Sequence, residues 1–273
     1  MIQKIKDSYF TDKNYGLIYG HHFLRNIASA AMYIFTGAYF LELGMPLHFV
    51  LLFYGLEFGV RGFLCPFGLS FLNKVGIIKA QIVAATFLIL FFVGISFSDQ
   101  NLWIGFFSLF LAAISGAIYY PFLDVFEAIY IKDNHNRTKQ LSMSLISGSL
   151  GKVVGAAGVG SLLSSFGFDI VLVFITFCLI LSIIPFFWLQ PHVTHIPTIK
   201  PKDVYDFIVQ DEFKDLWKPF FGEQLTIIVR AVMVPIFIYT IVGELDDLGY
   251  LIALSIILEK ILPPIRPLPS IIL

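Results

Sequence analysis

Long apolar runs separated by short polar gaps divide this chain from residue 23 onward. A membrane-spanning helix needs roughly 20 predominantly apolar residues. Backbone groups in hydrocarbon must find their hydrogen-bond partners within the protein, which favours helices. We therefore predict an all-α, polytopic helical membrane protein with spans at 23–43, 46–72, 80–98, 100–123, 140–166, 170–189, 219–242 and 248–262.

The longest polar gap, residues 190–218, divides these spans into two groups. Three prolines interrupt its first half, whereas apolar residues recur at near-helical spacing over residues 202–217, which predicts an amphipathic helix on the membrane surface. We predict a cytoplasmic arm (1–22), a six-helix transmembrane bundle (23–189), the linker (190–218) and the first helices of an incomplete second bundle (219–273). Two spans bury little by themselves, so we expect the chain to be truncated.

Basic residues occupy every second gap between the predicted spans. Short cytoplasmic loops of membrane proteins carry an excess of Lys and Arg. This pattern predicts a multi-pass protein of the cell membrane, the plasma or inner membrane in a bacterium, with its N-terminus in the cytoplasm. The basic positions are Lys4, Lys6, Lys13 and Arg25 in the N-terminal arm, then Lys74, Lys79, Lys132, Arg137, Lys139, Lys200, Lys202, Lys214, Lys218, Lys260 and Arg266.

Composition agrees with a membrane protein. Hydrophobic residues make up 58% of the chain and charged residues 14%, with a mean hydropathy of +0.84; a soluble domain has about 45–50% and about 25%. No basic face suggests nucleic-acid binding. No motif for a metal, nucleotide or other cofactor occurs, and Cys65 and Cys178 lack metal-ligand spacing.

Charged residues inside spans are costly and are therefore candidates for function. Glu57 and Arg61 are four residues apart, so they share one helix face and can form a structural pair or a cavity site. Lys152 and Arg230 lie about midway along the fifth and seventh predicted spans. Because cations outnumber Glu57 in this group, we expect an anionic solute or a carboxyl group that takes up a proton.

Two stretches and the order of spans resemble the major facilitator superfamily of secondary transporters. After the second span, that family has the motif G-x-x-x-D-[RK]-x-G-x-[RK]-[RK]; here Asn73, Lys74, Gly76 and Lys79 match its second half, with Asn73 in place of the acid. The fifth span resembles the family's glycine-rich motif without its proline, through Gly148, Gly151, Gly155, Gly158 and Gly160. These glycines predict either a close packing seam or the family's gating contact with the second half.

A weak internal repeat agrees with a protein of two similar halves. Aligning Ile34 with Ile236 also aligns Glu42 with Glu244 and Glu57 with Glu259. The resemblance implies a transporter of about twelve helices, cut short here after about eight. It also implies alternating access to a site near the membrane midplane, lined in the first half by spans one, two, four and five.

We therefore predict a transporter of a small solute rather than an enzyme, with Glu57, Arg61, Lys152 and Arg230 in its cavity and a proton as a possible coupling ion. Two alternatives remain open. One is a membrane-embedded enzyme for lipid-linked substrates that uses Asp124, Glu127 and His135 near the cytoplasmic face. The other is a non-functional fragment.

Overall fold

The computed structural model describes residues 13–130, 137–188 and 214–261, together with a few positions between 200 and 210. These residues are helical apart from short connections, and no strand occurs among them. The predicted all-α fold is confirmed. The elements are α2 (Lys13–Ala30), η1 (Ala31–Phe35), α3 (Thr36–Glu42), α4 (Leu47–Val75), α5 (Ile77–Ser96), α6 (Leu102–Phe107), α7 (Leu109–Tyr130), α8 (Arg137–Phe166), α9 (Phe168–Ile183), η2 (Ile184–Trp188), α11 (Lys214–Ile228), η4 (Val229–Met233), α12 (Val234–Val242) and α13 (Leu245–Ile261).

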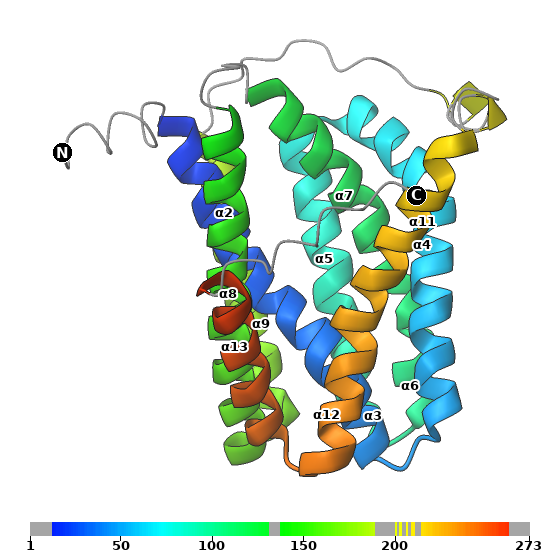
Figure 1. Cartoon of the computed structure of the whole chain (residues 1–273), viewed down its shortest axis with the longest axis vertical. Coiled ribbons are helices and arrows are strands. Elements are labelled where there is room, and N and C mark those ends of the chain that lie inside the picture. The colour runs from blue at the N-terminus through cyan, green and yellow to red at the C-terminus, as the bar shows by residue number, and fades with distance from the viewer. Residues whose placement is uncertain are drawn as a thin grey trace, which may run out of the picture.

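The helices run up and down through a single bundle (Figure 1). Within the described residues, six helical segments are long and apolar enough to cross a membrane: 47–75, 77–96, 102–123, 140–166, 168–188 and 221–242. The protein is therefore built as a membrane-embedded helical bundle. The first predicted span is the continuous rod of α2, η1 and α3, and the eighth is the 17-residue α13.

The bundle exposes many large apolar side chains on its outer surface, as expected of a protein surrounded by lipid. Phe63 is 72% exposed and Ile241 is 69% exposed, whereas Ala28, Ala38 and Glu57 are completely buried. Lipid solvates an outward-facing aromatic or aliphatic group well, while polar groups at membrane depth belong in the bundle interior. The outer faces of these helices are therefore suited to hydrocarbon.

One loop-forming residue of the family-like motif has a clear structural role. Gly76 connects α4 directly to α5 with a φ of 83°, a left-handed conformation that favours glycine. Asn73 and Lys74 end α4, and Lys79 lies in the first turn of α5. The motif therefore forms a reversal of the chain between the second and third spans.

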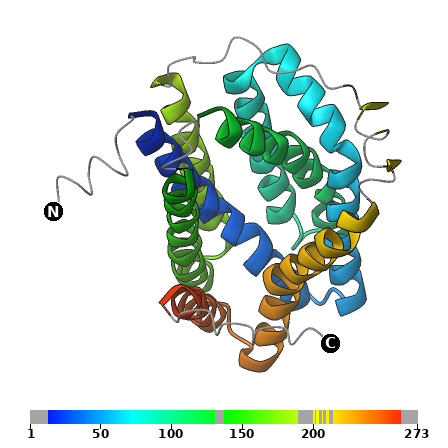
Figure 2. The same ribbon diagram turned by 45° about the horizontal axis from the view of Figure 1, so that its top comes forward.

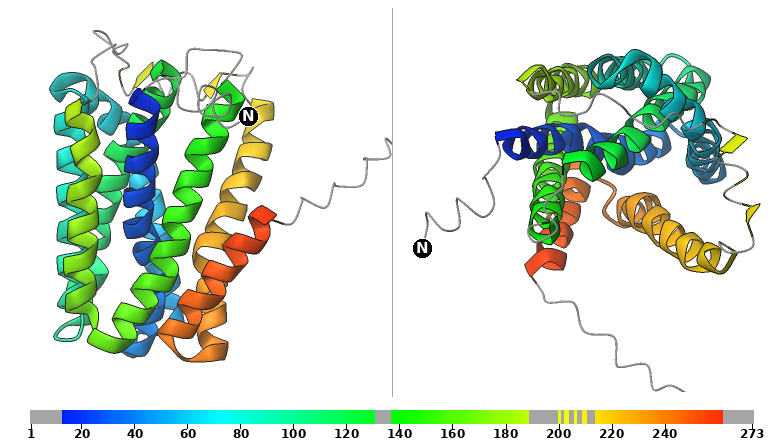
Figure 3. Two further views of the ribbon diagram at one scale, coloured as in Figure 1. Left: turned by 90° about the vertical axis from the view of Figure 1, so that its left-hand side faces the viewer. Right: turned by 90° about the horizontal axis from the view of Figure 1, so that it is seen from above.

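The glycines of α8 form two seams on this helix. A Cβ atom at Gly151 would meet the carbonyl oxygen of Phe23 in α2, and one at Gly155 would lie 2.9 Å from the Cβ of Ala30. Farther along α8, Gly160 packs against α13, where its Cβ would lie 3.3 Å from the Cα of Gly249. Small residues thus allow α8 to approach both α2 and α13, which flank it in Figure 3.

The four predicted packing glycines are not equivalent. A Cβ at Gly148 would lie 3.0 Å from Nδ2 of Asn26 on α2, so this position belongs to the same seam as Gly151 and Gly155. Gly158 has no atom within 4 Å of the position that its Cβ would take. Gly158 is therefore a helical glycine outside the contact.

This difference makes a matched test of the α2–α8 seam. We expect Gly151→Ala to lower the free energy of unfolding by about 1–3 kcal/mol, because the added methyl group overpacks a backbone contact. Gly158→Ala should raise it by about 0.5–1 kcal/mol, because alanine favours the helix. Unfolding of the purified protein in detergent, followed by circular dichroism, measures both. Equal effects of the two substitutions would contradict the seam.

A tyrosine side chain interrupts the backbone hydrogen bonds of the first span at η1. The hydroxyl of Tyr54 in α4 accepts a hydrogen bond from the backbone N of Gly37 at 3.0 Å and donates to the carbonyl O of Met32 at 3.2 Å. A side chain that inserts between such groups changes the local helical pitch. Here it lies beside a π-helical turn, a geometry often found at functional sites.

The seventh span has a similar interruption. There η4 joins α11 to α12 by a second π-helical turn, and the two turns contact each other across the bundle. The first spans of the two predicted halves therefore share an α–π–α construction, although aligning Ile34 with Ile236 would place the second π-helical turn at 233–237, four residues after its observed position. In Figure 2, α12 lies beside the lower end of the rod formed by α2, η1 and α3, where it contacts η1 and α3.

We expect Tyr54→Phe to destabilise the protein by about 1–3 kcal/mol, because it leaves two buried backbone groups without a partner. The control is Tyr250→Phe, whose hydroxyl contacts the hydroxyl of Ser161 at 2.8 Å at an exposed site. That variant should change stability by less than about 0.5 kcal/mol. Thermal unfolding in detergent compares the two, and a Tyr54 effect no larger than that of Tyr250 would argue against the inserted hydroxyl.

Several sequence predictions lie outside the described residues. They include the N-terminal arm up to residue 12, the linker from 189 to 199, part of the predicted amphipathic helix at 202–217 and the tail after residue 261. Positions 202, 203, 206 and 209 of that predicted helix are described as helical, and its end, Lys214–Trp217, begins α11. His135 and the side chains of Asp124 and Glu127, on which the enzyme alternative depends, also lie outside the described part.

Candidate functional site: a cationic cavity within the bundle

A cavity of about 710 Å³ lies between the first five spans and the seventh. This volume is within the range of sites that hold small molecules, about 300–1,000 Å³. Its walls come from α2, η1, α4, α5, α7, α8, α11 and η4. The polar and aromatic lining residues are His22, Arg25, Asn26, Ser29, Tyr33, Phe58, Arg61, Ser115, Tyr119, Tyr120 and Lys152.

The lining residues place this cavity at mid-depth in the bundle. Tyr33 belongs to η1, near the middle of the first span, and Arg61 is near the middle of the 29-residue α4. Lys152 is near the middle of the 30-residue α8, and Ala231 lies in η4 at the centre of the seventh span. A solute bound there would be far from both ends of the helices.

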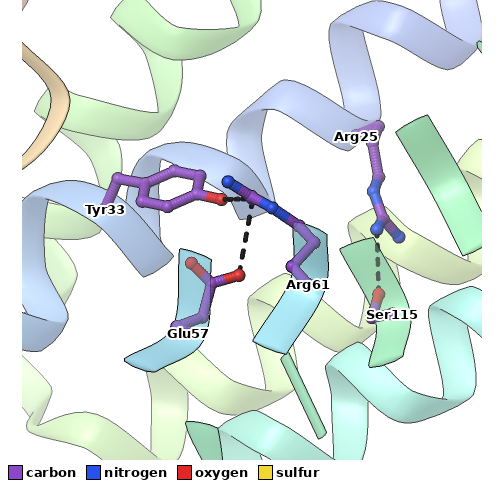
Figure 4. A network of polar contacts seen from close by, with 5 residues as sticks. All are labelled: Arg25, Tyr33, Glu57, Arg61 and Ser115. Carbon is purple, nitrogen blue, oxygen red and sulfur yellow. Dashed lines mark hydrogen bonds and ion pairs between the residues drawn. The ribbon is translucent and has the colours of Figure 1, made fainter. Parts of the chain in front are cut away.

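Arg61 is held by groups from three elements. Its Nη1 donates to the hydroxyl of Tyr33 at 2.6 Å and lies 3.4 Å from Oε1 of Glu57, as Figure 4 shows. Its guanidinium carbon is 4.3 Å from the ring centre of Phe58 and 4.9 Å from that of Tyr120. Aromatic faces attract a cation and stabilise it in desolvated surroundings. Glu57 and Arg61, which the sequence places four residues apart, thus form an ion pair.

Glu57 lies behind this arginine and does not line the cavity. Its side chain is completely buried, and neither carboxylate oxygen forms a hydrogen bond in the described structure. Its ion pair is with Arg61, from the next turn of the same helix. The pair is therefore asymmetric, since Arg61 has a face toward the cavity and Glu57 has none.

Arg25 is a second arginine of the cavity, although the pattern of basic residues assigned it to the cytoplasmic arm. It lies inside α2, only 6% exposed, and its Nη2 donates to Oγ of Ser115 at 3.2 Å (Figure 4). The hydroxyl of Ser115 in turn donates to the carbonyl O of Ala84 at 2.7 Å. The ring centre of Tyr119 is 4.3 Å from the guanidinium carbon of Arg25.

Helix α7 contacts both arginines through a pair of residues spaced four apart, and the two pairs are offset by one residue. Ser115 and Tyr119, one turn apart, contact Arg25, while Gly116 and Tyr120 contact Arg61. A Cβ at Gly116 would collide with Cδ of Arg61, so glycine leaves room for this side chain. The two guanidinium groups are therefore held by neighbouring positions on one helix.

Two further cations, Lys152 and Arg230, were predicted to line the cavity, and the structure places only Lys152 there. Lys152 lines the cavity from α8 and forms no hydrogen bond or ion pair within the described residues. Arg230 does not line it; its side chain is 67% exposed and its Nη1 lies 3.2 Å from Oε1 of Glu259 on α13. The seventh span instead contributes the apolar Ile227, Ile228 and Ala231.

Residue 25 lies within the predicted first span, so the sequence already indicated that Arg25 is a charge inside the membrane. Assigning it to the basic N-terminal arm hid this indication. Tyr33, Ser115, Tyr119 and Tyr120 had no such signal, since polar residues of moderate hydropathy occur throughout these helices. No group of three or more potential metal ligands occurs in the described part of the chain.

Comparison with known proteins adds no assignment, because neither protein-family models nor curated proteins match this sequence.

The Glu57–Arg61 pair can be tested by a double-mutant cycle. Arg61→Gln should lower the free energy of unfolding by about 3–5 kcal/mol, because it leaves a buried carboxylate without its cation. Adding Glu57→Gln should recover at least about 1 kcal/mol of that loss. Denaturation of the purified protein in mixed detergent micelles measures each variant.

Lys152→Gln is the control for this cycle, because it removes a cavity cation that has no partner among the described residues. It should change stability by less than about 0.5 kcal/mol. Additive effects of the Glu57 and Arg61 substitutions would show that the two groups do not depend on each other.

Proposed function

We propose that this chain is a secondary transporter of the major facilitator type, or the N-terminal portion of one, and that it moves a small solute by alternating access. The observation that supports this most strongly is the cavity, which lies at mid-depth and joins the six-span unit to the seventh span. Transport requires a site of this kind, with both membrane faces within reach of a rocking motion. An enzyme for lipid-linked substrates would instead gather its acids and bases at one membrane face.

The contacts between the two predicted halves suit a rocking motion. The two π-helical turns, η1 and η4, meet beside the cavity, and Gly160 and Gly249 form a glycine contact between α8 and α13. Helices separated by glycines can slide or tilt without large side chains interlocking. In this proposal, α11 to α13 move against the six-span unit and open the cavity to either membrane face in turn.

The ion pair offers a means of coupling to protons. A solute that binds Arg61 would compete with Glu57 for the same guanidinium. A buried carboxylate deprived of its cation is strongly destabilised, and taking up a proton relieves that cost. Glu57 is thus proposed as the proton carrier and Arg61 as the group that passes between carboxylate and solute.

The remaining assignments belong to the same proposal. The basic connections, including Lys74 and Lys79 between α4 and α5, would face the cytoplasm, with the protein in the cell membrane, the plasma or inner membrane in a bacterium. The Arg230–Glu259 pair lies on an exposed face, where hydrocarbon alone would be a poor solvent. Polar surroundings beside α11 and α13 would stabilise that pair better than hydrocarbon.

The transport proposal is tested by expressing wild-type protein and Lys152→Ala in the same host and comparing solutes in cells and medium by untargeted mass spectrometry. We expect at least one solute to be redistributed by the wild type and at least tenfold less by Lys152→Ala, roughly the loss of one charge contact of 1.4 kcal/mol. Lys202→Ala, an exposed position of the linker, serves as control. Equal solute profiles for wild type and empty vector would overturn transport.

Coupling is tested separately in proteoliposomes with the solute so identified. Glu57→Gln should retain exchange of labelled for unlabelled solute, because residue 57 does not line the cavity. It should lose accumulation driven by a pH gradient, because glutamine cannot carry a proton. Accumulation at the wild-type level would remove Glu57 from the coupling step.

A further inference from the structure

Among the described residues, the charges that line the cavity are all positive. Arg25, Arg61 and Lys152 contribute side chains to its wall, and no described Asp or Glu side chain does so. The nearby Glu57 lies behind Arg61 and can offset one of the three. The cavity therefore has an excess of positive charge that the described residues do not neutralise.

Of these three cations, Arg25 gives the strongest argument for a bound anion. Its hydrogen bond to Ser115 and its contact with Tyr119 involve neutral groups, and no carboxylate of the described residues pairs with it. A guanidinium group that is 6% exposed and has no counter-ion is costly at membrane depth. A bound anion would remove this cost, and Arg25 still has N–H donors that no described residue occupies.

The arrangement of the cations also specifies the shape of the anionic group. Guanidinium groups bind carboxylate and phosphate oxygens through paired N–H donors. Arg25 and Arg61, which both contact α7, line the same cavity as Lys152 of α8. The opposite wall, formed by Ile227, Ile228 and Ala231, offers only apolar contact.

We propose that the cavity binds a small organic anion, whose carboxylate or phosphate group lies between Arg25, Arg61 and Lys152 and whose apolar part lies against the seventh span. This inference rests on the proposed transport function and names the class of its substrate. In this arrangement, α11 and η4 contact the apolar part of the solute. The cations of the six-span unit bind its anionic group.

A native cysteine of the cavity can report the positive charge of its lining. Cys65 lines the cavity, whereas Cys178 is buried in α9 away from it, and neither forms a disulfide. On a Cys178→Ser background, Cys65 is treated with sulfonatoethyl methanethiosulfonate, an anion, or with the trimethylammonioethyl reagent, a cation of similar size. Each reagent transfers its thioalkyl group to the thiolate, forming a mixed disulfide and releasing methanesulfinate.

The measured quantity is the ratio of the two labelling rates, each divided by the rate with mercaptoethanol in solution. Any effect of a substitution on the reactivity of the thiolate cancels in this ratio, so only the response to reagent charge remains. We expect the anion to react faster. Arg25→Gln or Lys152→Gln should lower the ratio about tenfold, equivalent to about 1.4 kcal/mol. Lys202→Gln should leave it unchanged.

Three results would overturn the proposal: faster labelling by the cation, a ratio that neither folded variant lowers, or no labelling of Cys65 by either reagent. Lys152→Gln keeps the test decisive should Arg25→Gln fail to fold, since Lys152 has no partner among the described residues.

A competition arm distinguishes the two acids. Benzoate and phenyl phosphate are added at millimolar concentration, and the one that slows labelling identifies the anionic group. Benzylamine, a cation of similar size, should give no protection. Protection by benzylamine, or by neither acid, would contradict the anion class. Anion-selective labelling without solute movement in the expression experiment would instead overturn transport and leave the binding site in place.

Discussion

The ion pair between Glu57 and Arg61 is the interaction around which the centre of this bundle is organised. A charge at membrane depth is stable only beside an opposite charge, a polar group or a polarisable ring. Arg61 has all three, through Glu57, the hydroxyl of Tyr33 and the rings of Phe58 and Tyr120. Because these groups come from η1, α4 and α7, satisfying one arginine holds three spans in register.

Close helix approach supplies the second constraint. Gly68 of α4 faces the carbonyl of Ala117 of α7, and Gly116 makes space for Arg61 in the same interface. Gly151 and Gly155 bring α8 against α2, the helix that carries Arg25. The glycines therefore set the distances at which the charged side chains meet. The close packing of the helices and the positions of the charged side chains therefore depend on each other.

The order and approximate limits of the spans were predictable because each apolar run reports its own length. The second span, predicted over 46–72, is Leu47–Val75, and the fifth, predicted over 140–166, is Arg137–Phe166. The Glu57–Arg61 contact was predictable as well, because an interval of four residues on a helix brings two side chains together. The π-helical turns were not, since Tyr54 reaches η1 from another helix.

The sequence by itself determined the helical class, the succession of spans and the contacts made within one turn of a helix. Only the tertiary structure decided which side of each helix faces inward. Spans such as α5 and α9 are apolar on all sides, and a helix of that kind carries little indication of its rotation about its axis. Lys152 and Arg230 both lie near the middle of a span, so the sequence predicted both equally as cavity residues. In the packed structure Lys152 lines the cavity, whereas Arg230 pairs with Glu259.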